Sequence, residues 1–210
     1  MKNLLIALAF VGVSATSFAQ TNSVIANKSS VATNSFWNNW FVQGGVDWNV
    51  WYSDQEHGQN LTRNPFKSFR GVPGIAVAVG KWFTPGLGLR VKGQGIWGRR
   101  VDDDSHLQGT HKKGNKYWLI NGDALFNVSN MVVGYNPKRF YNLVPFVGAG
   151  IGRCMSTDFY GMYLRAGILN EFRVSKNIAI NLEFGWNRIE GDIDGSGSGT
   201  GRGWISHDNN

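Results

Sequence analysis

The residues best able to catalyse a reaction stand in polar, irregular stretches. A hydrolase would need a histidine beside a serine or a carboxylate, and residues 102–106, Asp-Asp-Asp-Ser-His, form the one suggestive cluster. The other histidines, His57, His111 and His207, fall in predicted loops or in the tail. Adjacent loop residues have no fixed geometry. We therefore interpret residues 102–106 as a solvated loop, assign no catalytic residue and predict a protein that is not an enzyme.

The sequence gives equally little support for a metal site or a reactive thiol. Asp192, Asp194 and Gly197 match the first, third and sixth places of a calcium-binding loop, but Gly203 stands where a bidentate glutamate is required. The single cysteine, Cys154, cannot form an internal disulfide. A buried small hydrophobe is the ordinary role of such a residue. We predict no metal site and no cofactor.

A strict period of two marks residues 74–94. Ile75, Val77 and Val79 share one face of the first half, and small residues share the other. In the second half apolar residues alternate with Arg90 and Lys92, and Pro85-Gly86 supplies a tight turn between the halves. The pattern predicts a β-hairpin with an apolar face and a small or charged face. Such a hairpin suits a barrel that is apolar outside and polar inside, as transmembrane β-barrels are.

The same alternation predicts five further strands, which brings the total to seven. They cover 40–52, 117–128, 140–153, about 162–173 and 178–187. Leu125 interrupts the polar face of the second of these. Pro145 lies inside the third, where we expect a bulge because proline cannot donate to the ladder, and Asn142 places its even positions inward. We predict an all-β, antiparallel up-and-down transmembrane β-barrel of the eight-stranded type, with about seven strands present.

Charged residues on the predicted inner face are balanced, four positive and four negative. Buried charges persist when they are paired and hydrogen-bonded, and an eight-stranded barrel is just wide enough for side chains to fill it. We therefore predict a structural polar network that plugs the lumen in preference to an open channel. Its members are Asp47, Arg90, Lys92, Asp123, Arg165, Glu171, Arg173 and Glu183.

The strand connections alternate between long polar segments and tight turns, as in outer-membrane barrels with long outer loops and short periplasmic turns. The long loops are predicted at 53–69 and 99–116, and 129–139 is predicted as a turn. Aromatic residues near the strand ends fit interfacial girdles. They are Trp40, Trp82, Phe83, Trp97, Tyr117, Phe172 and Trp186.

The N-terminus has the features of a secretory signal peptide. Lys2 precedes a short apolar run, and Ser17-Phe18-Ala19 offers a cleavage site. We predict a signal peptide at 1–19, a flexible lead-in at 20–36, the barrel at 37–190, and a Gly/Ser-rich outer loop with a truncated tail at 191–210. An eighth strand is missing from the pattern, although Trp204-Ile205 could begin one. Our hypothesis is that the chain is truncated, because an open sheet edge in lipid leaves backbone groups unpaired.

Export and charge narrow the expected partners. The net charge of +7 is scattered along the chain and does not form one basic run, and this scatter and the predicted export both argue against a nucleic-acid partner. We predict a Gram-negative outer-membrane location, with outer-membrane lipid and lipopolysaccharide as neighbours. Surface ligands are left open.

Four segments resemble the barrel domain of OmpA-family outer-membrane proteins. They are residues 79–90 (VGKWFTPGLGLR), 121–123 (NGD), 126–130 (FNVSN) and 145–152 (PFVGAGIG). The resemblance spans about 37–188 and implies an eight-stranded barrel, followed in longer relatives by a periplasmic domain that binds peptidoglycan. Neither a closing strand nor that domain is recognisable here, so peptidoglycan is expected as a partner only through a domain absent from this chain. The resemblance supplies no catalytic or ligand residues.

The predicted function is a structural, non-enzymatic barrel of the cell envelope with surface-exposed loops. One alternative is a narrow porin of low conductance. Another, from a different class, is a soluble lipocalin-like ligand-binding barrel, whose interior would be apolar. A third is a hydrolase that uses the loop at 102–106.

Overall fold

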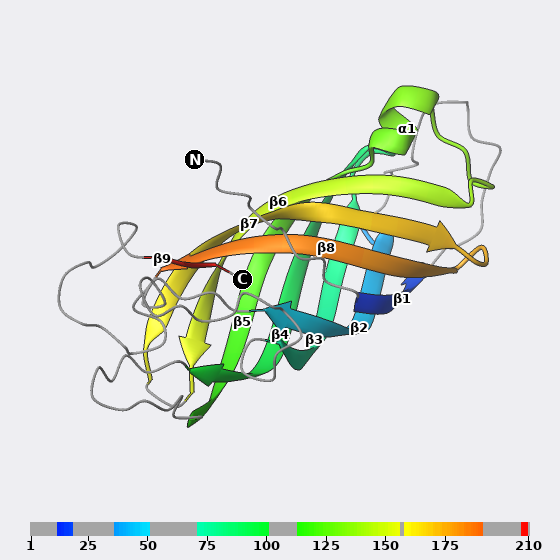
Figure 1. Cartoon of the computed structure of the whole chain (residues 1–210). Helices are drawn as coiled ribbons and strands as arrows, with labels where there is room; N and C mark the ends of the chain where they lie inside the picture. Colours follow the sequence, from blue (N-terminus) through cyan, green and yellow to red (C-terminus); the bar gives the residue numbers. More distant parts are fainter. Residues whose placement is uncertain are drawn as a thin grey trace, which may run out of the picture.

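The computed structural model describes residues 12–18, 36–50, 71–100, 113–155, 158–190 and 207–209. In this part of the chain one antiparallel sheet curls around a lumen, and each long strand pairs with the next along the chain (Figure 1). The fold is the predicted all-β, up-and-down arrangement with seven long strands. These are β2 (Trp40–Val50), β3 (Gly71–Trp82), β4 (Leu87–Arg100), β5 (Lys113–Phe126), β6 (Tyr141–Cys154), β7 (Tyr160–Arg173) and β8 (Ile178–Glu190).

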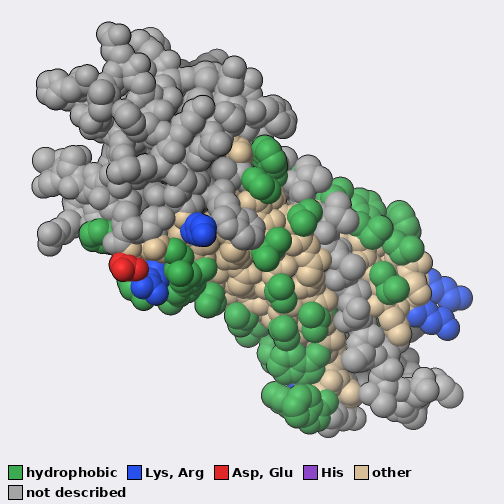
Figure 2. Space-filling view, turned by 90° about the horizontal axis from the view of Figure 1, so that it is seen from below, with side chains coloured by type: hydrophobic (Ala, Val, Ile, Leu, Met, Phe, Trp, Pro, Cys, Tyr) green, Lys and Arg blue, Asp and Glu red, His purple; other side chains and the backbone are tan. Residues whose placement is uncertain are grey.

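The faces of the sheet are inverted relative to a water-soluble barrel. Val77 is 60% exposed, whereas its neighbours Ala76 and Ala78 are buried. On β8, Ile178 is exposed on the outer wall and Asn181 is fully buried in the lumen. Hydrophobic side chains cover much of the visible wall in Figure 2, and the coloured charged groups lie toward the two ends. The alternation therefore predicted the correct side for both classes of residue.

Tight connections gather at one end of the barrel. We call this the turn end; it carries residues 83–86, 127–140 and 174–177, and the opposite end is the loop end. The amides of Phe83 and Thr84 donate to the carbonyl of Leu87, which closes the predicted turn at Pro85-Gly86. Val174 and Ser175 donate to Ile178 in the same way. The predicted loops at 53–69 and 191–203 lie outside the described residues.

Two predicted connections differ from the structure. Residues 99 and 100 were expected in a loop, but they pair with 114 and 113, so β4 and β5 form a longer hairpin. The expected turn after β5 contains the helix α1 (Val128–Val133), which also takes Val128 from the predicted strand. The side chain of Asn127 caps it by accepting from the amide of Asn130 at 2.9 Å. Six residues are too few to show a helical period in the sequence.

The bulge expected at Pro145 is absent. The register between β6 and β7 runs without interruption from Tyr141 to Arg153, with Pro145 opposite Ile168. The amide of Leu143 donates to the hydroxyl of Ser129 and not to β7, and amides of alternate residues point to the same side of a strand. The missing N–H of Pro145 therefore faces β5, where the ladder begins only at Phe146. No ladder hydrogen bond is lost at this position.

The predicted aromatic girdle is present in part. Phe83 and Trp186 are exposed on the outer wall near opposite strand ends. Tyr117 is an exception: it is 5% exposed, because its position on β5 has the parity of the lumen residues Leu119 and Asn121. The prediction assigned Tyr117 to the girdle because it lies near a strand end, and it did not take account of the residue's parity along β5.

The seam between β2 and β8 is filled by two short strands. β1 (Gly12–Phe18) pairs with β2 on one side and with β8 on the other. β9 (His207–Asn209) pairs with the far end of β8, where Asn209 lies opposite Arg188. Because the other edge of β8 is occupied by β7, β1 and β9 share one edge. Residues assigned to the signal peptide thus occupy the position expected for the missing strand; removal of 1–19 stays a prediction.

Candidate functional site: a charged layer in the lumen

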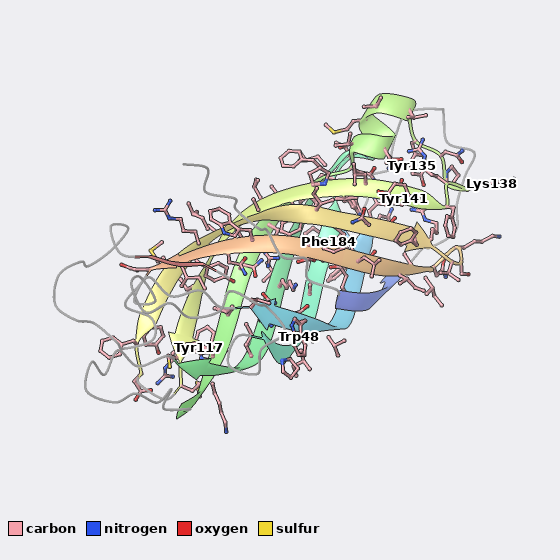
Figure 3. The ribbon with its side chains drawn as sticks, viewed as in Figure 1. Trp48, Tyr117, Tyr135, Lys138, Tyr141 and Phe184 are labelled. Atoms are coloured by element: carbon pink, nitrogen blue, oxygen red, sulfur yellow. The ribbon has the colours of Figure 1, made fainter. Side chains whose placement is uncertain are left out.

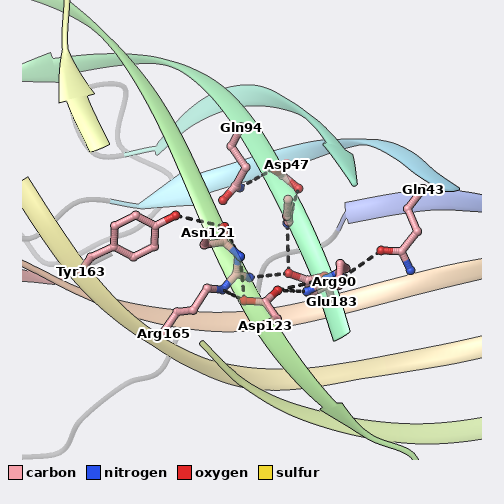
Figure 4. Close-up of polar contacts among 10 residues, drawn as sticks. Gln43, Asp47, Arg90, Gln94, Asn121, Asp123, Tyr163, Arg165 and Glu183 are labelled. Carbon is pink, nitrogen blue, oxygen red and sulfur yellow. Dashed lines mark hydrogen bonds and ion pairs between the residues drawn. The ribbon is translucent and has the colours of Figure 1, made fainter. Parts of the chain in front are cut away.

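Six of the eight predicted lumen charges meet in one network of ion pairs, and Figure 4 labels five of them. They come from β2, β4, β5, β7 and β8, and each points inward because of its place in the alternation. We call this set the charged layer. Its members are Asp47, Arg90, Lys92, Asp123, Arg165 and Glu183.

Arg90 connects β4 to the neighbouring strand β5 and to strands β2 and β8 farther around the barrel. It is the register partner of Asp123, and its Nη2 lies 2.6 Å from Asp123 Oδ2, with Nε at 3.0 Å from the same oxygen. Its Nη1 donates to Glu183 Oε2 at 2.7 Å and to Gln43 Oε1 at 3.0 Å. A guanidinium presents several donors in a rigid plane, which allows one side chain to hold two carboxylates and an amide.

Glu183 joins three cations. Its Oε1 accepts from Lys92 Nζ at 3.0 Å and from Arg165 Nη2 at 2.6 Å, while Oε2 accepts from Arg90. Asp47 supplies the second partner of Lys92, with Nζ and Oδ1 3.8 Å apart. The layer therefore contains three positive and three negative groups, in contact as one network.

Neutral side chains complete the layer. Asn121 donates to Asp123 Oδ1 at 2.6 Å and accepts from both Arg165 and the Tyr163 hydroxyl. Gln94 donates to Asp47 Oδ2 at 2.6 Å. Burying a charge is costly unless it is paired and hydrogen-bonded, and these amides donate to carboxylate oxygens that accept no hydrogen bond from the cations.

The other two predicted lumen charges lie apart from the layer. Glu171 and Arg173 are close together near the turn end, with Oε1 and Nη2 3.5 Å apart. Asn142 donates to Glu171 at 2.9 Å, and Arg173 donates to the carbonyl of Pro137 at 3.0 Å. The four-against-four balance thus divides into a three-against-three layer and one separate pair.

Apolar side chains lie on both sides of the charged layer along the barrel. Toward the loop end, Tyr117 and Cys154 belong to a buried cluster that also contains Ile96, Leu119, Tyr163 and Ile189. Toward the turn end the cluster is Phe41, Leu125, Val144, Phe146 and Leu169, with Trp82 packed against it. Phe146 also lies beneath the guanidinium groups of Arg90 and Arg165, at 5.2 and 4.8 Å from the ring centre. The lumen is layered: apolar, charged, apolar.

This arrangement supplies little reactive chemistry. Every carboxylate of the charged layer contacts a cation, and none lies beside a nucleophile with a base. Among the described residues no group of three or more potential ligands could hold a metal ion. The suggestive cluster at 102–106 lies outside the described residues. No helix in the described part is long and apolar enough to span a bilayer.

Sequence reasoning named the charges but missed two of the side chains that organise them. Tyr163 is 1% exposed and donates to Asn121; its odd position, two residues before Arg165, was the available signal. Phe146 was recognised as inward only through the parity of Asn142, and a parity cannot show that its ring meets two arginines from different strands. Such contacts depend on strand tilt and register across the lumen.

Comparisons with known proteins point to the same type of molecule. The chain is similar to outer membrane protein 40 of Porphyromonas gingivalis, with 23% identity over 202 residues, which cover 87% of this chain and 49% of that protein. It is also similar to outer membrane protein 41 of the same organism, with 27% identity over 173 residues, or 78% of this chain and 41% of that protein. Together with the inverted sheet, these similarities support an outer-membrane β-barrel protein.

The similarity has a limited reach. The chain spans about half or less of the length of these two relatives. No protein-family model matches it, and no solved structure does.

Proposed function

We propose that this chain is a non-enzymatic outer-membrane barrel of the OmpA type that contributes to envelope structure and does not conduct solutes. The single observation that carries the proposal is the layered lumen. Three cations and three carboxylates are locked to one another between two apolar clusters. A solute would have to separate these ion pairs and pass both clusters, and each separated charge would lose its partner in a region shielded from water.

The outer wall supports the membrane location. Large apolar residues stand on the outward positions of strands from β2 to β8, including Val46, Val91, Ile151 and Leu164, which are each about half exposed. Such a wall is unfavourable in water and favourable in hydrocarbon. A lipocalin-like barrel would require the opposite arrangement, with the apolar face inside. The soluble alternative is therefore not supported.

Conductance in planar bilayers tests the sealed lumen. We expect the folded full chain to give no steady channels, whereas a Leu119→Ala/Phe146→Ala/Glu183→Gln variant, which hollows both apolar clusters and breaks the charged layer, gives measurable current. Val147→Ala is the matched control, since Val147 is 52% exposed on the outer wall. Large, steady pores in the unmodified protein would replace the proposal with the narrow-porin alternative.

A deletion strain tests the envelope role. We expect loss of the protein to sensitise cells to detergent, and the unmodified gene to restore resistance. Cell fractionation of the complemented strain should recover the protein with the outer membrane. Loss of a lipid- or peptide-cleaving activity in the deletion strain, with no change in envelope integrity, would instead favour the hydrolase alternative.

The remaining partners follow from the proposed location. Lipopolysaccharide and phospholipid would surround the wall, and peptidoglycan would be reached only through a domain beyond the similarity described above. The predicted surface loops at 53–69 and 99–116 lie mainly outside the described residues.

A further inference from the structure

The turn end carries positive charge that no described carboxylate neutralises. Lys81, Lys138, Arg139 and Lys176 stand there at or beside the connections between strands. No described ion pair involves any of these four side chains. The one acidic residue described near this end, Glu171, is buried and engaged by Asn142 and Arg173. We call the four basic residues, with the apolar side chains beside them, the basic rim.

Neutral groups hold two of these cations in place. Lys81 Nζ donates to the carbonyl of Phe36 at 2.6 Å and lies 4.6 Å from the Phe36 ring centre and 5.6 Å from that of Trp40. Arg139 donates to Asn130 Oδ1 at 2.9 Å and to the carbonyl of Gly134 at 2.8 Å. Their charges are positioned but uncompensated, which leaves them available to an anion outside the protein.

Exposed apolar side chains are interleaved with these cations. Figure 3 shows Tyr135, Lys138 and Tyr141 close together at the turn end, beside α1. The helix itself has no buried residue, yet it is anchored by the Asn130 side chain, which donates to the carbonyl of Pro85 at 2.9 Å. Its apolar surface is therefore held outward. The most exposed apolar residues of the rim are Phe36, Trp37, Val132, Val133, Phe140 and Val174.

The loop end differs in charge. There Arg153 forms an ion pair with Asp158 at 2.7 Å, and Glu190 accepts from the amide of Met162. Described acidic and basic groups thus occur together at the loop end, whereas the basic rim has cations without acidic partners. The lack of described acidic partners at the basic rim favours an anionic partner there.

We propose that the basic rim binds anionic phospholipid in the leaflet around the turn end, with α1 embedded at the boundary between headgroups and acyl chains. The proposal rests on the membrane location proposed above and adds a lipid class and a surface. Basic side chains bind anionic lipid phosphates, aromatic residues favour the interface, and short apolar segments bury their exposed face there. The apolar wall ends at this rim, so its height matches the headgroup region.

Lipid enrichment around the folded full chain tests the proposal. The protein is reconstituted in nanodiscs of phosphatidylcholine with a minority of phosphatidylglycerol, and energy transfer to a labelled lipid reports which lipid surrounds it. We expect phosphatidylglycerol to be enriched, and a Lys138→Gln/Lys176→Gln variant to bind it at least about fivefold more weakly. The matched control is Lys116→Gln/Arg153→Gln, which removes two positive charges at the loop end and should leave the enrichment unchanged.

The outcomes separate this proposal from the proposed function. Equal losses in the two variants, no enrichment in a reconstituted unmodified protein, or displacement of the lipid by millimolar inorganic phosphate would each overturn the lipid-binding rim. Failure of the protein to enter the bilayer at all would instead overturn the membrane location.

The position of α1 is measured separately. A dye attached at Val132→Cys should be quenched by lipids that carry a quencher near the headgroup, while a dye at Lys138→Cys should be quenched by aqueous iodide. Both residues are exposed, and the native Cys154 is fully buried, so labelling of the folded chain is selective. A dye at position 132 that iodide reaches as readily as free dye would show that α1 lies in water.

Discussion

Glu183 Oε2 accepts a hydrogen bond from Arg90 Nη1 at 2.7 Å, although 93 residues separate the two along the chain. The contact crosses the lumen from β4 to β8. Glu183 also meets Lys92 and Arg165, so one carboxylate holds cations from two strands. The charged layer therefore depends on the whole barrel, because it forms only when distant strands have the correct register.

Removing the charge of Glu183 should destabilise the barrel strongly. Glu183→Gln keeps the size of the side chain but leaves three buried cations facing two carboxylates, and breaking a buried pair costs about 3–5 kcal/mol. Urea unfolding of the protein in lipid vesicles measures the loss. Glu190→Gln is the control, because Glu190 is only partly buried at the end of β8, and its effect should stay within about 0.5 kcal/mol. Similar losses in both variants would contradict the role of the layer.

Arg90 and Asp123 should be energetically coupled. They are register partners on adjacent strands with two hydrogen bonds between them. A double-mutant cycle with Arg90→Gln and Asp123→Asn should give a coupling energy of about 0.5–3 kcal/mol. Unfolding free energies in vesicles supply the four corners of the cycle. Strict additivity would mean that the pair is held by the sheet and contributes no stability of its own.

Gly148 should not tolerate a side chain. A Cβ at this position would collide with the Asp123 carboxylate and the carbonyl of Gly122. Gly148→Ala should therefore cost about 1–3 kcal/mol through overpacking, together with disturbance of the charged layer. Gly122→Ala is the matched control on the neighbouring strand, where nothing lies within 4 Å of the added carbon. Thermal or urea unfolding in vesicles distinguishes the two, and a stable Gly148 variant would show that the wall can move aside.

Phe146 should matter more than its neighbour on the outer wall. Phe146→Ala removes a 1% exposed ring that packs in the turn-end cluster and against two guanidinium groups. We expect a loss of about 3–5 kcal/mol and faster amide hydrogen exchange in the neighbouring lumen-facing segments. Val147→Ala should change both quantities little. Unaltered hydrogen exchange in the Phe146 variant would contradict a closed lumen.

Processing of the N-terminus should empty part of the seam. Ala15 and Ile180 are register partners, so a full chain refolded with Ala15→Cys/Ile180→Cys should form a disulfide under mild oxidation. Ala15→Cys paired with Val147→Cys is the control, because β6 does not pair with β1. Protein isolated from cells should instead have a mass that begins after Ala19 and should lack the cross-link. Retention of residues 1–19 in the membrane would contradict the predicted cleavage.

The alternation predicted most of the barrel because one side of every strand faces lipid. Val77 and Asn181 could be assigned to opposite faces from sequence alone, since a residue on the wrong side would put a polar group in hydrocarbon or an apolar group among charges. The same logic identified the lumen charges before any pairing was visible.

The rest depended on contacts that a local pattern does not encode. α1 is held by Asn127 and by the turn at Pro85, and no period appears in its six residues. Pro145 fits a regular strand only because the ladder with β5 has ended at that point. The separation of Glu171 and Arg173 from the charged layer follows from their height along the barrel, which requires the three-dimensional register.

The shared edge of β8 also bears on how the molecule is assembled. Until a strand settles beside β2 and β8, both margins present unsatisfied amides and carbonyls, and any extended chain of suitable pattern can hydrogen-bond to them. A neighbouring copy of the protein is such a chain. Crowding during folding therefore favours pairing between molecules, and a chaperone that shields these two strand edges would raise the yield of monomeric barrels.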